Sequence, residues 1–293
     1  MNKALSFGYK KFAIHDGDGI RTTLFLSGCP LSCAWCHNVE GKKACSILGY
    51  FEHKCINCGE CVKVCKSGAH FLKDGVHIFD RKKCVLCGKC EKICLGDAIV
   101  FYGKEISPKQ AVELFKQDKD FYGELGGATL SGGECLIWPD FCFEVAKLLQ
   151  EEKIGLDIDT SAFVQYEYLQ RLIPFVDKFL IDIKAINDEI HKKITGVSNK
   201  IILENIIKLV KEKANIEIRV PLIPTINDNE MKGIAKFIAD VGIEDVRILP
   251  YHNFYFSKAD ALGIKVVKSI PLPSANLIEE TKQLFKMQLL NVK

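Results

Sequence analysis

Apolar residues recur along the chain with two spacings, one typical of buried strands and one typical of helices. Compact apolar runs predict six strands, at residues 21–27, 126–131, 155–160, 177–183, 216–222 and 245–250. Helical spacing predicts helices at residues 107–116, 140–151, 166–173, 200–213 and 229–240. Because strands and helices alternate, the pattern indicates parallel β/α units, and the predicted fold is α/β, a partial (β/α)6 barrel.

Composition predicts a globular, cytoplasmic protein. Hydrophobic residues make up 48% of the 293 residues, which supplies a sizeable core. The longest apolar run is broken by charge before the roughly 18 residues that a membrane span needs, and the N-terminal segment lacks the apolar stretch of a signal peptide. The net charge of +3 creates no strong field, so neither nucleic acid nor a membrane is an expected partner.

Fourteen cysteines without an export signal indicate metal binding or catalysis, because a reducing cytosol keeps thiols free. Two groups repeat the spacing C-x2-C-x2-C-x3-C, which is that of bacterial ferredoxins, where the fourth cysteine of each run ligates the other 4Fe-4S cluster. The two expected ligand sets are Cys55, Cys58, Cys61 with Cys94, and Cys84, Cys87, Cys90 with Cys65. Structural zinc is the alternative, but zinc usually takes its ligands from two separated pairs.

A third group has the spacing C-x3-C-x2-C and consists of Cys29, Cys33 and Cys36. Three thiolates leave one iron of a cluster without a protein ligand, and such an open position suits a substrate rather than a structural role. Three cysteines stay unassigned, and any of them could close the site or be a small buried apolar residue. They are Cys45, Cys135 and Cys142.

The segment GCPLSCAWCHN resembles the signature of the radical SAM superfamily. The resemblance implies that the open iron binds S-adenosylmethionine and that the cluster of Cys29, Cys33 and Cys36 cleaves it to a 5'-deoxyadenosyl radical. It also implies that Trp35 contacts the adenine, whereas plain core packing is the alternative role of this side chain.

The preceding segment HDGDGIRTTLFLSGC resembles the opening of the activating enzymes of glycyl radical enzymes, with Asp18 where that family usually has Pro. The resemblance implies that the substrate is a protein, a glycyl radical enzyme, and that this protein contacts Asp16 and Arg219, the latter in the segment RVPLIPTIND. It implies a bacterial-ferredoxin-like insertion with two 4Fe-4S clusters at 51–102, between barrel segments 1–50 and 103–293.

Residues at the expected strand ends resemble the cofactor site of the same family. Gly132, Gly133 and Glu134 match its GGE motif for the methionine amine, although the glycines alone would also suit a strand-to-helix turn. Lys184 would pair with the carboxylate of S-adenosylmethionine. Further cofactor positions, with room for a monovalent cation, are Asp159, Thr160, Asp182 and His252. An ion pair at a sheet end is the alternative for Asp182 and Lys184.

The cysteine spacing predicts three 4Fe-4S clusters, and the resemblance implies a monomeric oxidoreductase that uses S-adenosylmethionine to abstract a hydrogen from a glycine α-carbon of its partner. An electron donor such as flavodoxin or ferredoxin is expected, and the insertion would relay electrons or dock the partner. A radical SAM peptide maturase or small-molecule enzyme is one alternative, and a non-catalytic electron carrier is another.

Overall fold

A computed structural model describes residues 2–293, and its main sheet confirms the predicted partial barrel. The six expected strands lie side by side and parallel, in the order β12-β11-β10-β9-β8-β2. Their bounds are β2 (Arg21–Leu26), β8 (Gly127–Gly132), β9 (Gly155–Thr160), β10 (Lys178–Asp182), β11 (Ile216–Leu222) and β12 (Asp245–Pro250).

Three further strands that the apolar pattern did not predict extend this sheet at its two edges. They are β1 (Ala4–Ala13), β7 (Lys104–Ile106) and β13 (Asn291–Val292). β1 pairs antiparallel with both β2 and β7, while β13 pairs parallel with β12. The described sheet therefore has nine strands and stays open.

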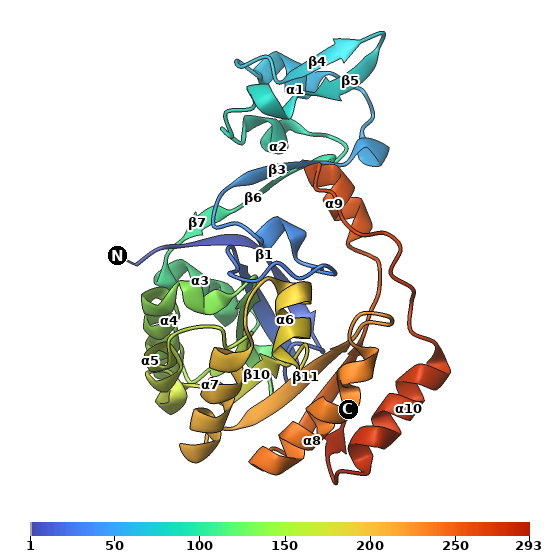
Figure 1. The fold of residues 1–293 in the computed structure, drawn as a ribbon. Coiled ribbons are helices and arrows are strands. Elements are labelled where there is room, and N and C mark those ends of the chain that lie inside the picture. The colour runs from blue at the N-terminus through green and yellow to red at the C-terminus, as the bar shows by residue number, and fades with distance from the viewer. Residues whose placement is uncertain (1) are drawn as a thin grey trace.

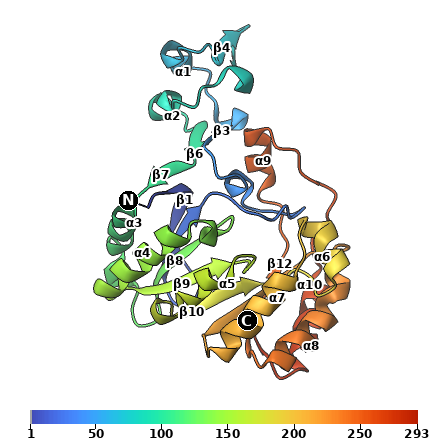
Figure 2. The same cartoon turned by 60° about the vertical axis from the view of Figure 1, so that its left-hand side comes forward.

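Most of the helices cover one face of the sheet (Figures 1 and 2), whereas α9 (Phe256–Leu262) packs against β3 (Ile47–Tyr50). Their bounds are α3 (Pro108–Lys116), α4 (Pro139–Glu151), α5 (Tyr166–Gln170), α6 (Asp188–Thr195), α7 (Lys200–Lys211), α8 (Met231–Val241), α9 (Phe256–Leu262) and α10 (Ala275–Lys286). Ser107 caps α3 through a capping box with Gln110. Apolar side chains of α4, α7 and α8 pack with strand residues such as Ile158 and Ile218 into one buried core. The five expected helices are confirmed. The apolar pattern did not predict α6, α9 or α10.

The cysteine-rich segment forms a small lobe that projects from the barrel (Figure 1). It holds α1 (Glu60–Val64), α2 (Lys89–Ile93) and the hairpin of β4 (His70–Lys73) with β5 (Val76–Phe79). β3 (Ile47–Tyr50) pairs with β6 (Ile99–Tyr102), so the paired lobe begins a few residues before the expected boundary at 51. Arg81 fastens the lobe to the barrel by donating to the carbonyl of Ala261 in α9, and within the lobe it donates to the carbonyl of Leu48.

Among residues 2–293, none of the helices combines the length and the apolar character that crossing a membrane requires.

Candidate active site

The face of the sheet turned away from the core helices carries charged side chains on alternate positions. On β9 these are Asp157 and Asp159, and on β11 they are Glu217 and Arg219. Side chains two apart on a strand share a face, so these charges share the interior of the partial barrel. Arg21 lies 3.2 Å from Asp157, and burial raises the pKa of Asp157 to about 7 despite this partner.

The loop between β1 and β2 lies against this charged interior. The backbone carbonyl of Asp16 accepts a 2.7 Å hydrogen bond from Thr129, and its carboxylate accepts one of 2.9 Å from Thr23. Arg219 donates to the carbonyl of His15 and pairs with Asp159 at 3.2 Å. The structure therefore brings the two expected protein-substrate residues, Asp16 and Arg219, into one place.

Arg219 also keeps one unused donor. Its side chain is buried, and its Nε has no hydrogen-bond partner among the described residues. A buried donor without a partner is costly, so this nitrogen points to a missing acceptor. Burial raises the pKa of Asp159 to about 6 although Arg219 opposes the shift.

The loop after β2 carries the three-cysteine group. Cys33 is buried, while Cys29 and Cys36 are partly buried beside it. Burial raises the pKa of Cys29 to about 12 and that of Cys33 to about 11, and it also raises the pKa of Cys36. Protein groups alone therefore leave three protonated thiols, whereas a bound metal deprotonates its thiol ligands. This donor set fits an iron-sulfur cluster.

The three unassigned cysteines lie in two different environments. Cys135 and Cys142 are fully buried in the apolar core beneath the sheet, separate from the cluster of apolar residues around Cys33. The neighbouring Cys142 thiol and burial raise the pKa of Cys135. Cys45 is exposed on the segment before β3. Burial in a different cluster of apolar residues thus sets Cys135 and Cys142 apart from the three-cysteine group.

Glu134 follows β8 and is fully buried, with both carboxylate oxygens occupied by the protein itself. Oε1 accepts from Leu136 N at 3.1 Å and from Thr160 Oγ1 at 2.7 Å. Oε2 accepts from the backbone N–H and the hydroxyl of Ser161, at 2.8 and 2.5 Å. The side chains of Glu134 and Thr160 thus bind each other and join the ends of β8 and β9.

The two glycines before Glu134 allow close approach to the cysteine loop. A Cβ added to Gly133 would lie 2.4 Å from the carbonyl oxygen of Gly28, and one added to Gly132 would lie 2.2 Å from that of Leu26. Asn38 of the cysteine loop donates to the carbonyl of Gly132 at 2.8 Å. Backbone contact therefore holds the loop against the end of β8.

Lys184 lies just beyond β10 and is buried beside the cysteine loop. Its Nζ contacts Asp182 Oδ2 at 2.8 Å. Burial opposes its charge, yet Asp182 and Cys33 raise the pKa of Lys184 above its ordinary value. The ion pair named above as the alternative is present, and it places a cation next to the three thiols.

Trp35 is 5% exposed and packs in the apolar cluster with Tyr251 and Tyr255, so its ring is mostly enclosed. His252 follows β12, and its carbonyl accepts from His37 Nε2 at 2.8 Å. The two imidazole rings stack with centroids 3.9 Å apart. The buried Nδ1 of His252 has no partner in the described part of the chain.

Sequence reasoning missed three contributors to this site. His37 directly follows Cys36, and that adjacency was the available signal. Asn38 and Ser161 act through backbone contacts and a carboxylate brought close only by the fold. No spacing in the sequence indicates such contacts.

The lobe contains two cavities, each lined by four of its cysteines. The first is lined by Cys55, Cys58, Cys61 and Cys94. The second is lined by Cys65, Cys84, Cys87 and Cys90. Each cavity thus takes three cysteines from one run and the fourth from the other, the crossover arrangement of two-cluster ferredoxins.

Comparison with known proteins adds independent information. Residues 23–238 match the Radical SAM superfamily. The chain is 39% identical to a trans-4-hydroxy-L-proline dehydratase activating enzyme of Clostridioides difficile, over 99% of this chain and 98% of that protein. It is 37% identical to a (2S)-3-sulfopropanediol dehydratase activating enzyme of Klebsiella oxytoca, over 88% and 85%. A crystal structure of a domain of pyruvate-formate lyase-activating enzyme from Bacteroides vulgatus aligns with a TM-score of 0.50 and 25% identity, covering 57% of this chain and 98% of that one.

Proposed function

This chain belongs to the radical SAM superfamily and, within it, to the activating enzymes of glycyl radical enzymes, and from that premise we propose which residues hold its cofactors and meet its partner. As a member it is an enzyme with a 4Fe-4S cluster and S-adenosylmethionine, and the electron-carrier alternative is set aside. The observation that carries the proposal is the set of three thiols, one buried and two partly buried, beside the cation of Lys184.

We assign the catalytic cluster to Cys29, Cys33 and Cys36. When reduced, such a cluster supplies one electron that cleaves S-adenosylmethionine to methionine and a 5'-deoxyadenosyl radical. The loop that carries the thiols is held by the backbone of Gly28 and by Asn38, both bonded to the end of β8. The chain thereby fixes the position of the open side of the site before any ligand binds.

Lys184 is proposed to bind the carboxylate of S-adenosylmethionine. It is buried, charged and adjacent to Cys33, and its partner Asp182 holds the ammonium in place. Gly132 and Gly133 are proposed to offer backbone carbonyls to the methionyl amine. Because both oxygens of Glu134 are occupied, its side chain is proposed to position this turn, together with Thr160, rather than to touch the cofactor.

The adenosyl part is proposed to lie toward Trp35 and His252. His252 offers an unpartnered Nδ1, as judged over residues 2–293, and stacks on His37, which follows the last cysteine of the loop. Asp159 is held by Ser131 at 2.6 Å and by Arg219. Both contacts are made to Oδ2, and they support a positioning role for this carboxylate.

Asp16 and Arg219 are proposed to meet the glycine loop of the partner. Arg219 Nε is a buried donor in need of an acceptor, and a backbone carbonyl of an inserted loop would supply one. The sheet is open at its edges, which leaves a lateral path for a protein segment. Enclosure of that segment would shield a radical from water.

Residues 51–102 are proposed to form a ferredoxin-like insertion with two further 4Fe-4S clusters, one in each cavity of the lobe, between barrel segments 1–50 and 103–293. The cysteine composition of the two cavities supports this assignment. We further propose that these clusters relay electrons from flavodoxin or ferredoxin, that the enzyme is a monomer, and that it works in the reducing cytoplasm, where its fourteen thiols stay free.

The first experiment measures cofactor content and cleavage. Anaerobically reconstituted protein is expected to hold about twelve irons, from three clusters of four, and to release 5'-deoxyadenosine upon reduction with S-adenosylmethionine. About four irons with cleavage would remove the two insertion clusters from the proposal. Twelve irons without cleavage would contradict the catalytic assignment of the three thiols.

The second experiment identifies the partner. The relatives are named for several glycyl radical enzymes, including a trans-4-hydroxy-L-proline dehydratase and a choline trimethylamine-lyase, so a panel of such enzymes is incubated with the reduced protein. A glycyl radical signal in one of them by electron paramagnetic resonance is the expected result. Cleavage of S-adenosylmethionine with no radical in any partner, including those encoded beside its gene, would favour the maturase alternative.

A further inference from the structure

The β4–β5 hairpin of the cysteine-rich lobe buries two histidines where an apolar pair would be expected. His70 and His77 are each 3% exposed, and their rings lie between the two cysteine-lined cavities. His77 lines the cavity of Cys55 and Cys61, whereas His70 lines the other one. Burying two imidazoles is costly unless their nitrogens find partners.

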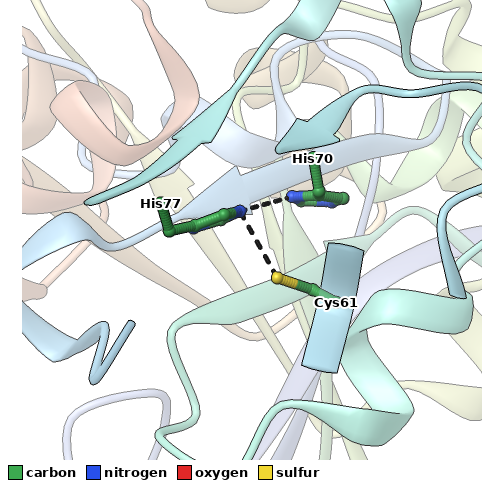
Figure 3. Close-up of side chains that lie close together, drawn as sticks. All are labelled: Cys61, His70 and His77. Atoms are coloured by element: carbon green, nitrogen blue, oxygen red, sulfur yellow. Dashed lines mark hydrogen bonds between the residues drawn. The ribbon is translucent and has the colours of Figure 1, made fainter. Parts of the chain in front are cut away.

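Those partners include the sulfur atoms of the first cavity. His77 Nε2 lies 3.3 Å from Cys61 Sγ and 2.9 Å from His70 Nδ1, as Figure 3 shows. His77 Nδ1 lies 3.6 Å from Cys55 Sγ. A neutral imidazole carries its proton on one nitrogen. When His70 Nδ1–H donates to His77 Nε2, the proton of His77 lies on Nδ1 and faces Cys55 of the first cavity. Asn57, which accepts from the backbone N–H of His77 at 2.9 Å, holds the strand in place.

The internal repeat of the lobe shows what stands at the equivalent position of the second cavity. His77 lies seven residues before Cys84, and Leu48 lies seven residues before Cys55. Leu48 is buried and lines the second cavity as His77 lines the first. A leucine has no donor, so this wall of the second cavity lacks the N–H that the first one has.

His70 has an apolar counterpart as well. It lies five residues after Cys65, and Ile99 lies five residues after Cys94. His70 stacks on Phe79 with centroids 4.7 Å apart, which fixes its ring against His77. Its Nδ1 shares the hydrogen bond with His77 and therefore selects the tautomer of that ring.

We propose that His77, held by His70, is a positioning residue that raises the reduction potential of the cluster bound by Cys55, Cys58, Cys61 and Cys94 above that of its neighbour. This inference rests on the proposed presence of clusters in the two cavities. Hydrogen bonds to cluster sulfurs are a known determinant of reduction potential, because they stabilise the more negative reduced state. One electron from a reduced flavin or ferredoxin donor then reduces the first cavity's cluster before the second, with no bond made or broken.

The same three side chains offer a second chemistry. Ligand atoms of Cys61, His70 and His77 lie within 4.8 Å of one another, which would suit a single zinc ion. Zinc would take Cys61 out of its ferredoxin-type set and break the crossover pattern of the cavities. The cavity linings therefore favour the hydrogen-bonding role, and zinc becomes an outcome of the test.

The test is a redox titration of the reconstituted full-length protein, followed by electron paramagnetic resonance. His77→Leu and His70→Ile replace each histidine with the residue type at the equivalent position of the repeat, which is Leu48 for His77 and Ile99 for His70. His77→Leu is expected to lower the higher of the two insertion-cluster potentials by about 59 mV, a tenfold change in the one-electron equilibrium constant. His77→Gln, which keeps an N–H, should retain most of the wild-type potential. Leu72→Ala, an exposed change opposite His77, is the matched control and should shift neither potential.

Iron and zinc contents accompany each titration. If His77→Leu keeps about twelve irons and both potentials are unchanged, the role of His77 is overturned and the insertion clusters stand. If the wild-type protein holds only about four irons, both the role of His77 and the proposed insertion clusters are overturned. One zinc per chain, lost in His77→Leu, would also overturn the role of His77. If His77→Leu loses iron, pulsed electron paramagnetic resonance of wild-type protein labelled with ¹⁵N-histidine replaces the titration, because it measures the coupling between a histidine nitrogen and a reduced cluster. A nitrogen coupling at the cluster reduced first supports the inference, and no coupling overturns it.

Discussion

Replacing Glu134 with Gln tests whether this carboxylate positions the cofactor turn or binds the cofactor itself. The carboxylate accepts four hydrogen bonds and is fully buried. An amide offers one accepting oxygen, so its NH2 group must face the backbone N–H of either Leu136 or Ser161. One buried N–H then loses its acceptor, at a cost of about 1–3 kcal/mol, and the remaining bonds lose their charge assistance. The expected loss of stability is about 3 kcal/mol.

For a chain of this length, that loss corresponds to a fall in Tm of about 5 °C. Anaerobic thermal unfolding of the loaded enzyme measures it, with the exposed Glu151→Gln as matched control. The Kd for S-adenosylmethionine should change by less than about fivefold, or 1 kcal/mol, because the side chain faces the protein. An unchanged Tm with a large loss of affinity would refute the reasoning, since the carboxylate would then bind the cofactor directly.

Three further changes probe the interior and the cysteines. The pKa of Asp157 is raised to about 7 in the folded protein, so its contribution to stability is present at low pH and is lost as pH rises through 7. Between pH 6 and pH 8 the free energy of unfolding should fall by about 1 kcal/mol, and Tm should fall with it. An equal fall in an Asp157→Asn variant would contradict this prediction. Cys142→Ala should retain all iron and lower the free energy of unfolding by about 1–2 kcal/mol, because it leaves a small cavity in the core. Cys29→Ala should lose about four irons. Iron loss in Cys142→Ala would mean that Cys142 is a ligand. Lys184→Met should keep its iron and weaken S-adenosylmethionine binding by about 10- to 100-fold, as expected for a buried charged contact, and unchanged affinity by calorimetry would remove Lys184 from the cofactor site.

Most of the six parallel strands could be predicted because they are buried on both faces, whereas β12 alternates between buried and partly exposed positions. β11 is buried along its whole length, and such strands appear in the sequence as compact apolar runs. β1 escaped prediction because its pairing with β2 contains two irregularities, which disrupt the alternation of apolar and polar residues. Local pattern thus predicts regular buried strands and misses irregular edges.

The candidate site divides in the same way. Spacing alone indicated the cysteine sets, because cluster ligands occur at short fixed separations. The contact between Glu134 and Ser161 joins the ends of two different strands, and no periodicity encodes it. The histidine pair depends on a hairpin register that sets Leu72, not His70, opposite His77. Comparison of the two halves of the repeat could have drawn attention to His77, since Leu48 holds the matching position.

The central claim is that a radical formed at the three-cysteine site removes hydrogen directly from a glycine α-carbon of the partner. A responsive glycyl radical enzyme labelled with α-deuterated glycine tests this claim most directly. The account predicts deuterium in the released 5'-deoxyadenosine, together with a glycyl radical signal in the partner. Release of 5'-deoxyadenosine free of deuterium, with no such signal, would contradict it.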